Sequence, residues 1–145
     1  MKSTTWLASL AVTLGVFAAG HTAGTAIPRP PRGAREAFVI QAMQGTRLPM
    51  MGFERSYWDF YYGFALVISV LMVVMAAIAW QLRGVARADP SRALAMTVTL
   101  GAGCLGLLLL SVAFFFTGPI VLSALTVFCA TMAAVSLGRE ARRAD

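Results

Sequence analysis

Charged residues are scarce in this sequence and unevenly placed. Only 12% of the 145 residues are Asp, Glu, Lys or Arg, whereas about a quarter are charged in an average soluble domain. Residues 3–28, 60–82 and 93–138 contain no Asp, Glu, Lys or Arg. A helix needs roughly 20 apolar residues to cross a bilayer, so the third run is long enough for two crossings. This pattern excludes a soluble globular enzyme and a disordered chain, and it predicts a small polytopic membrane protein.

Cysteine and histidine are also rare. The two cysteines, Cys104 and Cys129, lie inside apolar runs and form no C-x-x-C pair, which excludes a disulfide scaffold and a membrane thiol oxidase. We expect both to be small packing residues. The single histidine, His21, argues against haem, and the acidic residues lack the tight spacing of metal ligands. We therefore expect no cofactor and no metal.

The apolar runs predict an all-α membrane protein with four antiparallel transmembrane helices in one domain, 1–145. The expected spans are about 5–27, 57–82, 93–116 and 119–138. They are joined by an outer loop 28–56, a basic inner loop 83–92 and a turn at 117–118. Pro119 opens the fourth span, and a polar tail follows at 139–145. Within the outer loop, 35–44 reads as a short interfacial helix and 48–53 as a turn. The first run resembles a signal peptide, but it is longer than a usual signal core, so we expect it to be retained.

Basic residues set the expected orientation. The net charge is +6, and the arginines lie at the ends of the apolar runs, where they suit anionic lipid headgroups rather than nucleic acid. With both termini in the cytoplasm, seven basic residues lie inside and five outside. This bias favours cytoplasmic termini in an inner (plasma) membrane. The expected partners are membrane lipids and, in addition, a protein partner or a second copy of the chain.

Small residues form two stripes. Residues 101–106 match the letters of a dinucleotide-binding G-x-G-x-x-G, but they lie inside an apolar run with no acid about 20 residues later. Helical spacing of Thr97, Gly101 and Cys104 instead predicts close helix packing. We expect Gly20 and Gly24 to do the same at the end of the first span.

The segment 55–64 (Arg-Ser-Tyr-Trp-Asp-Phe-Tyr-Tyr-Gly-Phe) is the most informative. On a helix, Arg55, Asp59 and Tyr62 share one face, and Arg55 can pair with Asp59 four residues later. One interpretation is a self-neutralising anchor pair at the lip of the span. The other is a polar site within the bundle, for which Arg55, Tyr62 and Trp58 are candidate ligand-binding residues.

Titratable groups converge on the same predicted outer mouth. His21 lies near the outer end of the first span, Asp59 at the outer start of the second, and Glu36 in the loop between them. These three are the candidate catalytic residues. His21 is open to a second interpretation as a hydrogen-bonded structural histidine.

Two motifs carry a resemblance. Gly20-His21-Thr22-x-Gly24, followed by Arg55-Ser-Tyr-Trp-Asp-Phe-Tyr-x-Gly-Phe64 and by Trp80-Gln-Leu before a basic stretch, resembles an uncharacterised family of small four-helix bacterial integral membrane proteins. The resemblance implies four spans, a retained first helix, and His21 and Asp59 as the residues to test. It implies no particular activity.

Two functional classes follow. The leading hypothesis is a non-enzymatic multi-pass membrane protein, an accessory or lipid-binding component with a polar pocket on its outer face. The alternative is a membrane enzyme that acts on a lipid-like or quinone-like substrate at the outer interface, with His21 and Asp59 as its acid–base groups. A four-helix multidrug exporter is excluded because the first span carries no acidic residue.

Overall fold

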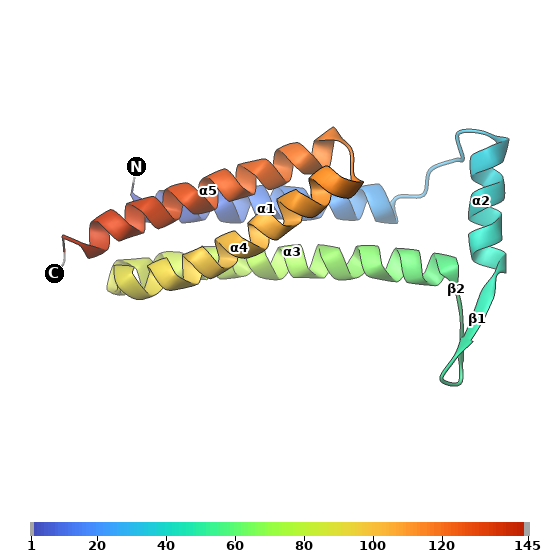
Figure 1. Cartoon of the computed structure of the whole chain (residues 1–145), viewed down its shortest axis with the longest axis horizontal. Helices are drawn as coiled ribbons and strands as arrows, with labels where there is room; N and C mark the ends of the chain where they lie inside the picture. The colour runs from blue at the N-terminus through green and yellow to red at the C-terminus, as the bar shows by residue number, and fades with distance from the viewer. Residues whose placement is uncertain (1, 144–145) are drawn as a thin grey trace. The chain divides into compact units, whose positions relative to one another are not determined.

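The structure, a computed structural model, describes residues 2–143, and 83% of these residues are helical (Figure 1). Its elements in order are α1 (Ser3–Ala26), α2 (Ala34–Gly45), β1 (Arg47–Met50), β2 (Phe53–Ser56), α3 (Tyr57–Ala88), α4 (Pro90–Phe114) and α5 (Thr117–Ala141). Four of these helices, α1, α3, α4 and α5, are long and apolar enough to cross a membrane. The helical class, the four candidate spans and the short helix between the first two agree with the sequence prediction.

The connection between α3 and α4 is shorter than predicted. In place of a basic loop 83–92, α3 continues to Ala88 and α4 begins at Pro90, with only Asp89 between them. The Asp89 carboxylate accepts a hydrogen bond from the Arg92 backbone N–H at 2.9 Å, and Pro90 stands at the first helical position, which needs no N–H donor. This cap starts α4 at once and leaves the preceding basic residues helical.

The turn between α4 and α5 also differs from the expectation. It consists of Phe115 and Phe116 rather than residues 117–118, because α5 already begins at Thr117. Pro119 is therefore the third residue of α5 and not the first. Its missing N–H is still harmless, since the first four N–H groups of a helix have no partner within it. At the far end, α5 extends to Ala141, so part of the predicted polar tail is helical, and residues 144–145 of that tail lie outside the described residues.

The chain divides into two compact units, of which the first comprises residues 1–18 and 71–145. The inward-facing residues of this unit recur at steps of three and four. In α5 the buried residues are Ser123, Thr126, Cys129, Ala130, Ala133 and Leu137. In α4 they are Ala93, Thr97, Leu100, Cys104 and Ser111. This spacing is the heptad pattern of helices that pack side by side with knobs in holes.

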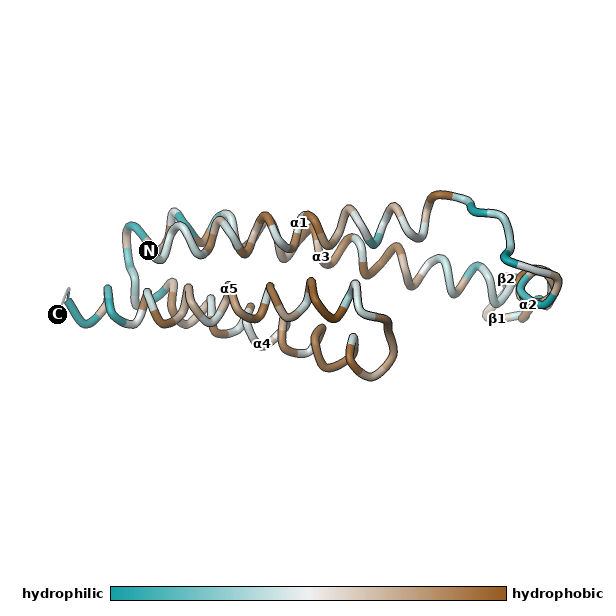
Figure 2. Tube along the Cα trace, turned by 90° about the horizontal axis from the view of Figure 1, so that it is seen from above, coloured by the Kyte–Doolittle hydropathy of each residue, from teal (hydrophilic) through white to brown (hydrophobic). Residues whose placement is uncertain are grey.

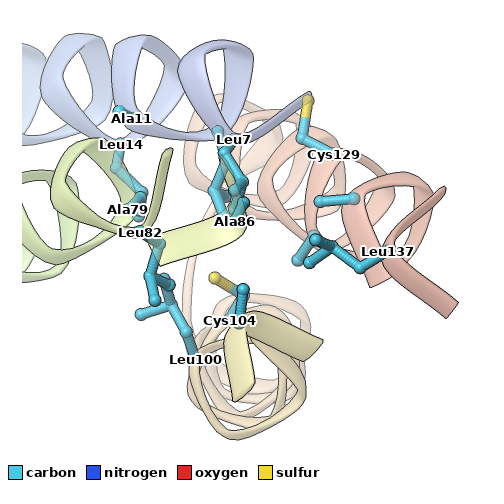
Figure 3. Close-up of a cluster of buried hydrophobic side chains, with 14 residues drawn as sticks. Leu7, Ala11, Leu14, Ala79, Leu82, Ala86, Leu100, Cys104, Cys129 and Leu137 are labelled. Carbon is cyan, nitrogen blue, oxygen red and sulfur yellow. The ribbon is translucent and has the colours of Figure 1, made fainter. Parts of the chain in front are cut away.

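The core of the first unit joins all four long helices. Leu7, Leu14, Leu82 and Leu137 are each at most 1% exposed, and Figure 3 shows them with Cys104 and other members of the same buried cluster. Both cysteines are buried and free, as expected for packing residues.

Small residues bring α4 and α5 together. A Cβ added to Gly101 would lie 3.5 Å from the Ala130 Cβ, and Cys104, three residues further along α4, is fully buried. The packing interpretation is thus confirmed at Gly101 and Cys104, whereas a Cβ added to Gly106 would meet no atom within 4 Å.

Large apolar side chains also face outward from the helices of the first unit. Examples are Leu109 at 63%, Phe114 at 76% and Phe128 at 53% exposed. Figure 2 shows hydrophobic residues along α4 and α5 and hydrophilic ones in the last turns of α5. Patches of this extent are unusual on a protein surface in water. They are compatible with a multi-pass membrane protein whose outer surface contacts lipid.

The second unit, residues 19–70, contains a β-hairpin where the sequence pattern predicted only a turn. β1 pairs antiparallel with β2, and Met50 stands opposite Phe53. The two loop residues, Met51 (φ 49°) and Gly52 (φ 85°), both have positive φ. Two such residues make a type I′ turn, whose twist suits a hairpin. A Met-Gly pair is a weaker hairpin signal than Asn-Gly, which explains why the strands were not predicted.

The short helix α2 follows the prediction closely, since it spans Ala34–Gly45 where 35–44 was expected. It has no buried residue, and its Phe38 and Val39 side chains are 71% and 53% exposed. An exposed apolar stripe fits a helix that lies along a membrane interface. The predicted packing role of Gly20 and Gly24 is wrong within this unit, because a Cβ on either would meet no atom within 4 Å.

Candidate functional site

Asp59 begins helix α3 by a reciprocal pair of hydrogen bonds with Ser56. The Asp59 Oδ2 atom accepts from the Ser56 backbone N–H at 2.7 Å, and the Asp59 backbone N–H donates to the Ser56 Oγ atom at 3.1 Å. This Ser-x-x-Asp arrangement is a capping box. It provides acceptors for the backbone N–H groups of Asp59, inside the helix, and of Ser56, just before it. The carboxylate of Asp59 therefore stabilises the start of α3.

The predicted pair of Arg55 with Asp59 is not formed. Arg55 belongs to β2 rather than to the helix, so the helical spacing that would bring it to Asp59 does not apply. Its guanidinium donates to the Glu54 carbonyl at 3.1 Å and lies 5.5 Å from the centroid of the Phe53 ring. Among residues 2–143 the one ion pair joins Arg29 to Glu36. The anchor-pair interpretation is therefore replaced by the capping box.

His21 is held by a backbone group of α3. Its Nε2 atom lies 3.0 Å from the Ala65 carbonyl oxygen. A carbonyl oxygen only accepts, so Nε2 must carry the proton in this hydrogen bond. Ala65 follows Asp59 by six residues, which is about 9 Å along a helix, and no hydrogen bond joins His21 to Asp59 in the described part of the chain. The hydrogen-bonded structural interpretation of His21 has a partner, whereas the acid–base pair has none.

Glu36 organises the start of α2 and does not join the other candidates. Its carboxylate accepts from the Arg29 guanidinium at 2.7 Å and from the Arg32 backbone N–H at 2.5 Å. The hydrogen bond from Arg29, followed by that from Arg32, holds the pKa of Glu36 below its usual range. Glu36 is thus linked to Arg32 through the backbone of that residue and not through its side chain.

A shallow groove of about 380 Å³ runs along one face of the first turns of α3. Arg55 and Asp59 line its polar end, and Phe60, Gly63, Phe64 and Val67 supply the apolar remainder. The apolar residues recur at steps of three and four, so they share one helix face. This periodicity is visible in the sequence, but the site prediction for segment 55–64 rested on its polar and charged residues and left the apolar ones out.

Trp58 and Tyr62, the other predicted ligand-binding residues, do not line this groove. The Trp58 ring packs against Tyr61 with the centroids 5.5 Å apart, and Tyr62 is half-buried. Of the six predicted site residues, Arg55 and Asp59 thus line this groove and the other four do not. No cluster of three His, Cys, Asp or Glu side chains that could hold a metal ion occurs among residues 2–143.

These features define a class: a small helical chain with four candidate membrane spans, a cap-stabilised second long helix and an amphipathic groove where that helix begins. Comparison of the chain with protein-family models, with curated proteins and with solved structures gives no match.

Proposed function

We propose that the chain is a non-enzymatic multi-pass membrane protein that binds a phospholipid in the groove at the start of α3. The observation that carries the proposal is a groove lined by one cation, Arg55, and one anion, Asp59, together with an apolar floor. Such a floor suits an acyl chain, and the two opposite charges suit a zwitterionic headgroup.

The headgroup chemistry favours phosphatidylethanolamine. The Arg55 guanidinium is a good donor to a phosphate diester. The Asp59 carboxylate uses Oδ2 for the Ser56 N–H, which leaves acceptor capacity for an ammonium group. Phosphatidylcholine would offer no N–H donor to that carboxylate, so the groove should prefer the ethanolamine lipid.

The proposed location is an inner (plasma) membrane, with both termini in the cytoplasm and the groove on the outer face. The protein is an accessory component, and its resemblance to the small four-helix bacterial family supports the four spans and the retained first helix. Among the described residues, no contact of His21 or Asp59 favours the alternative of a lipid-modifying or quinone-modifying enzyme.

Filling the groove tests the proposal. A Cβ at Gly63 meets no atom within 4 Å, so Gly63→Leu should fold and occupy the apolar floor. Gly84 lies on the same helix with equally open space and outside the groove, which makes Gly84→Leu the matched control. Native mass spectrometry of detergent-solubilised protein with phosphatidylethanolamine should show weaker binding to Gly63→Leu and unchanged binding to Gly84→Leu.

Arg55→Gln should also weaken binding, because it removes the phosphate donor. Equal binding of phosphatidylethanolamine to the wild type and to Gly63→Leu would overturn the lipid groove. A preference for phosphatidylcholine over phosphatidylethanolamine would overturn the role given to Asp59.

A further inference from the structure

A second cleft, unrelated to the groove on α3, lies in the first unit. Its volume is about 570 Å³, within the range of about 300–1,000 Å³ that is usual for small-ligand sites. Three segments distant in sequence line it: the start of α1 with Lys2 and Ser3, the last turn of α3 with Arg87, and the end of α5 with Glu140 and Arg143.

Glu140 joins two of these segments. Its Oε1 atom accepts from the Ser3 backbone N–H at 3.0 Å, and its Oε2 atom accepts from the Ser3 hydroxyl at 2.5 Å. Ser3 is only 1% exposed, so this contact fixes the first turn of α1 against the last turn of α5. The carboxylate also lies at the positive end of the α1 dipole, where a negative charge is stabilised.

The cleft carries excess positive charge. Lys2, Arg87 and Arg143 are exposed cations on its lining, against the single carboxylate of Glu140. Both oxygens of that carboxylate are already committed to Ser3. None of the three cations forms an ion pair within residues 2–143. Three cations around one cleft, with no ion-pair partner among the described residues, repel each other, and a bound anion would relieve that repulsion.

The location restricts the type of anion. The cleft is formed where three candidate membrane spans begin or end: α1 at Ser3, α3 at Ala88 and α5 at Ala141. The ends of spanning helices lie at the level of lipid headgroups. Phosphate is the anionic group present there at the highest density, and arginine matches its geometry by paired N–H donors.

We propose that this cleft binds the phosphate of an anionic phospholipid headgroup through Lys2, Arg87 and Arg143. Glu140 is a positioning residue, because it holds α1 in place and touches no ligand. The site is independent of the proposed function, since it shares no residue with the groove on α3.

The test compares two double variants that remove equal charge. The first, Arg87→Gln with Arg143→Gln, removes both guanidinium groups that line the cleft. Arg92→Gln with Arg139→Gln removes two exposed arginines of the same unit that do not line the cleft. Native mass spectrometry would measure binding of phosphatidylglycerol and of phosphatidylcholine, each with and without inorganic phosphate as competitor.

The wild type should bind phosphatidylglycerol more tightly than phosphatidylcholine. General attraction to an anionic surface is about 1 kcal/mol, or about fivefold, per basic residue, and both double variants lose it equally. The cleft variant should lose roughly a further tenfold, as expected for charge-assisted phosphate bonds. Lys2→Gln alone should show a smaller loss in the same direction, and inorganic phosphate should compete for the wild-type site.

Equal losses in the two double variants would overturn the site and leave only diffuse surface attraction. Saturation by inorganic phosphate, with no preference for phosphatidylglycerol over phosphatidylcholine, would overturn the lipid assignment and identify free phosphate as the ligand. Neither result depends on Gly63 or Arg55, so failure of this site and failure of the groove are distinguishable.

Discussion

At the scale of single residues, the few acids of this chain serve mainly to begin helices. Asp59 caps α3, Asp89 caps α4, Glu140 holds the first turn of α1, and Glu36 anchors the start of α2. These are four of the six acidic residues in the sequence. Helix starts carry N–H groups with no partner inside the helix, and an apolar environment makes that lack costly. Acids committed in this way are poorly placed to serve as catalytic bases.

The capping box predicts which residue Asp59 is coupled to. Ser56→Ala removes a buried helix cap and should cost about 1 kcal/mol of stability. Asp59→Asn should also destabilise, and the two changes together should cost less than the sum of their separate effects. Thermal unfolding in detergent of the single and double variants measures this coupling. Arg55→Gln provides the control cycle, and stronger coupling of Asp59 to Arg55 than to Ser56 would contradict the capping box.

The contacts of Glu36 predict a pH dependence outside the spans. The lowered pKa of its carboxyl means that ionised Glu36 stabilises the folded state at neutral pH. This contribution is fully present above the pKa of the unfolded chain and is lost as pH falls through the lower folded value. NMR titration of the Glu36 side chain should therefore give a pKa below that of a free glutamate.

Arg29→Gln should raise the pKa of Glu36 towards its ordinary value, because it removes the largest cause of the shift. Arg35→Gln, an exposed neighbour with no role in that shift, is the control. A Glu36 titration that is unchanged by Arg29→Gln would show that the ion pair does not form in solution.

At the scale of elements, apolar run length predicted the four long helices, whereas local hydrogen bonds set their ends. Helix α3 continues past Leu82 into a basic segment, where composition alone placed a loop. This segment is helical instead, because the Asp89-Pro90 cap starts α4 immediately after α3 ends. Both the Ser56-x-x-Asp59 box and the Asp-Pro start are readable patterns. The prediction missed them because it took residue 55 as helical in one case and began the helix after Arg92 in the other.

The contact of α4 with α5 predicts a graded response at Gly101. Gly101→Ala should be tolerated, because its Cβ would sit 3.5 Å from Ala130, an ordinary contact distance. Gly101→Leu should cost about 1–3 kcal/mol, since the larger side chain overpacks the interface. Gly106→Leu, on the same helix with nothing within 4 Å, should cost little. Unfolding midpoints in a denaturing detergent check the series, and equal effects of the two leucines would contradict the close approach at Gly101.

At the scale of the whole molecule, fold class was more predictable from the sequence than the site was. Hydropathy acts over whole runs, so roughly 18 or more apolar residues suffice to predict a span. A functional site, in contrast, depends on contacts between particular side chains, which can be distant in sequence. His21 has the hydrogen bond that its structural interpretation requires, but the sequence did not identify the partner, Ala65. The basic residues of the cleft around Glu140 come from three distant segments that no local spacing connects. Arg55 and Asp59 line one groove because they are close in sequence, but the ion pair predicted from their spacing does not form.

The orientation of the whole chain is the last prediction. Four crossings bring both chain ends to one side of a membrane, and the seven-to-five distribution of basic residues favours the cytoplasm for that side. Reporter fusions at Asp89 and after the C-terminal residue should therefore read cytoplasmic, and a fusion at Gly45, the end of α2, should read external. Asp89 is the sharpest inner position because it is the single residue between α3 and α4. A cytoplasmic signal at Gly45 with an external signal at Asp89 would invert the topology and show that so small a charge difference does not set the orientation.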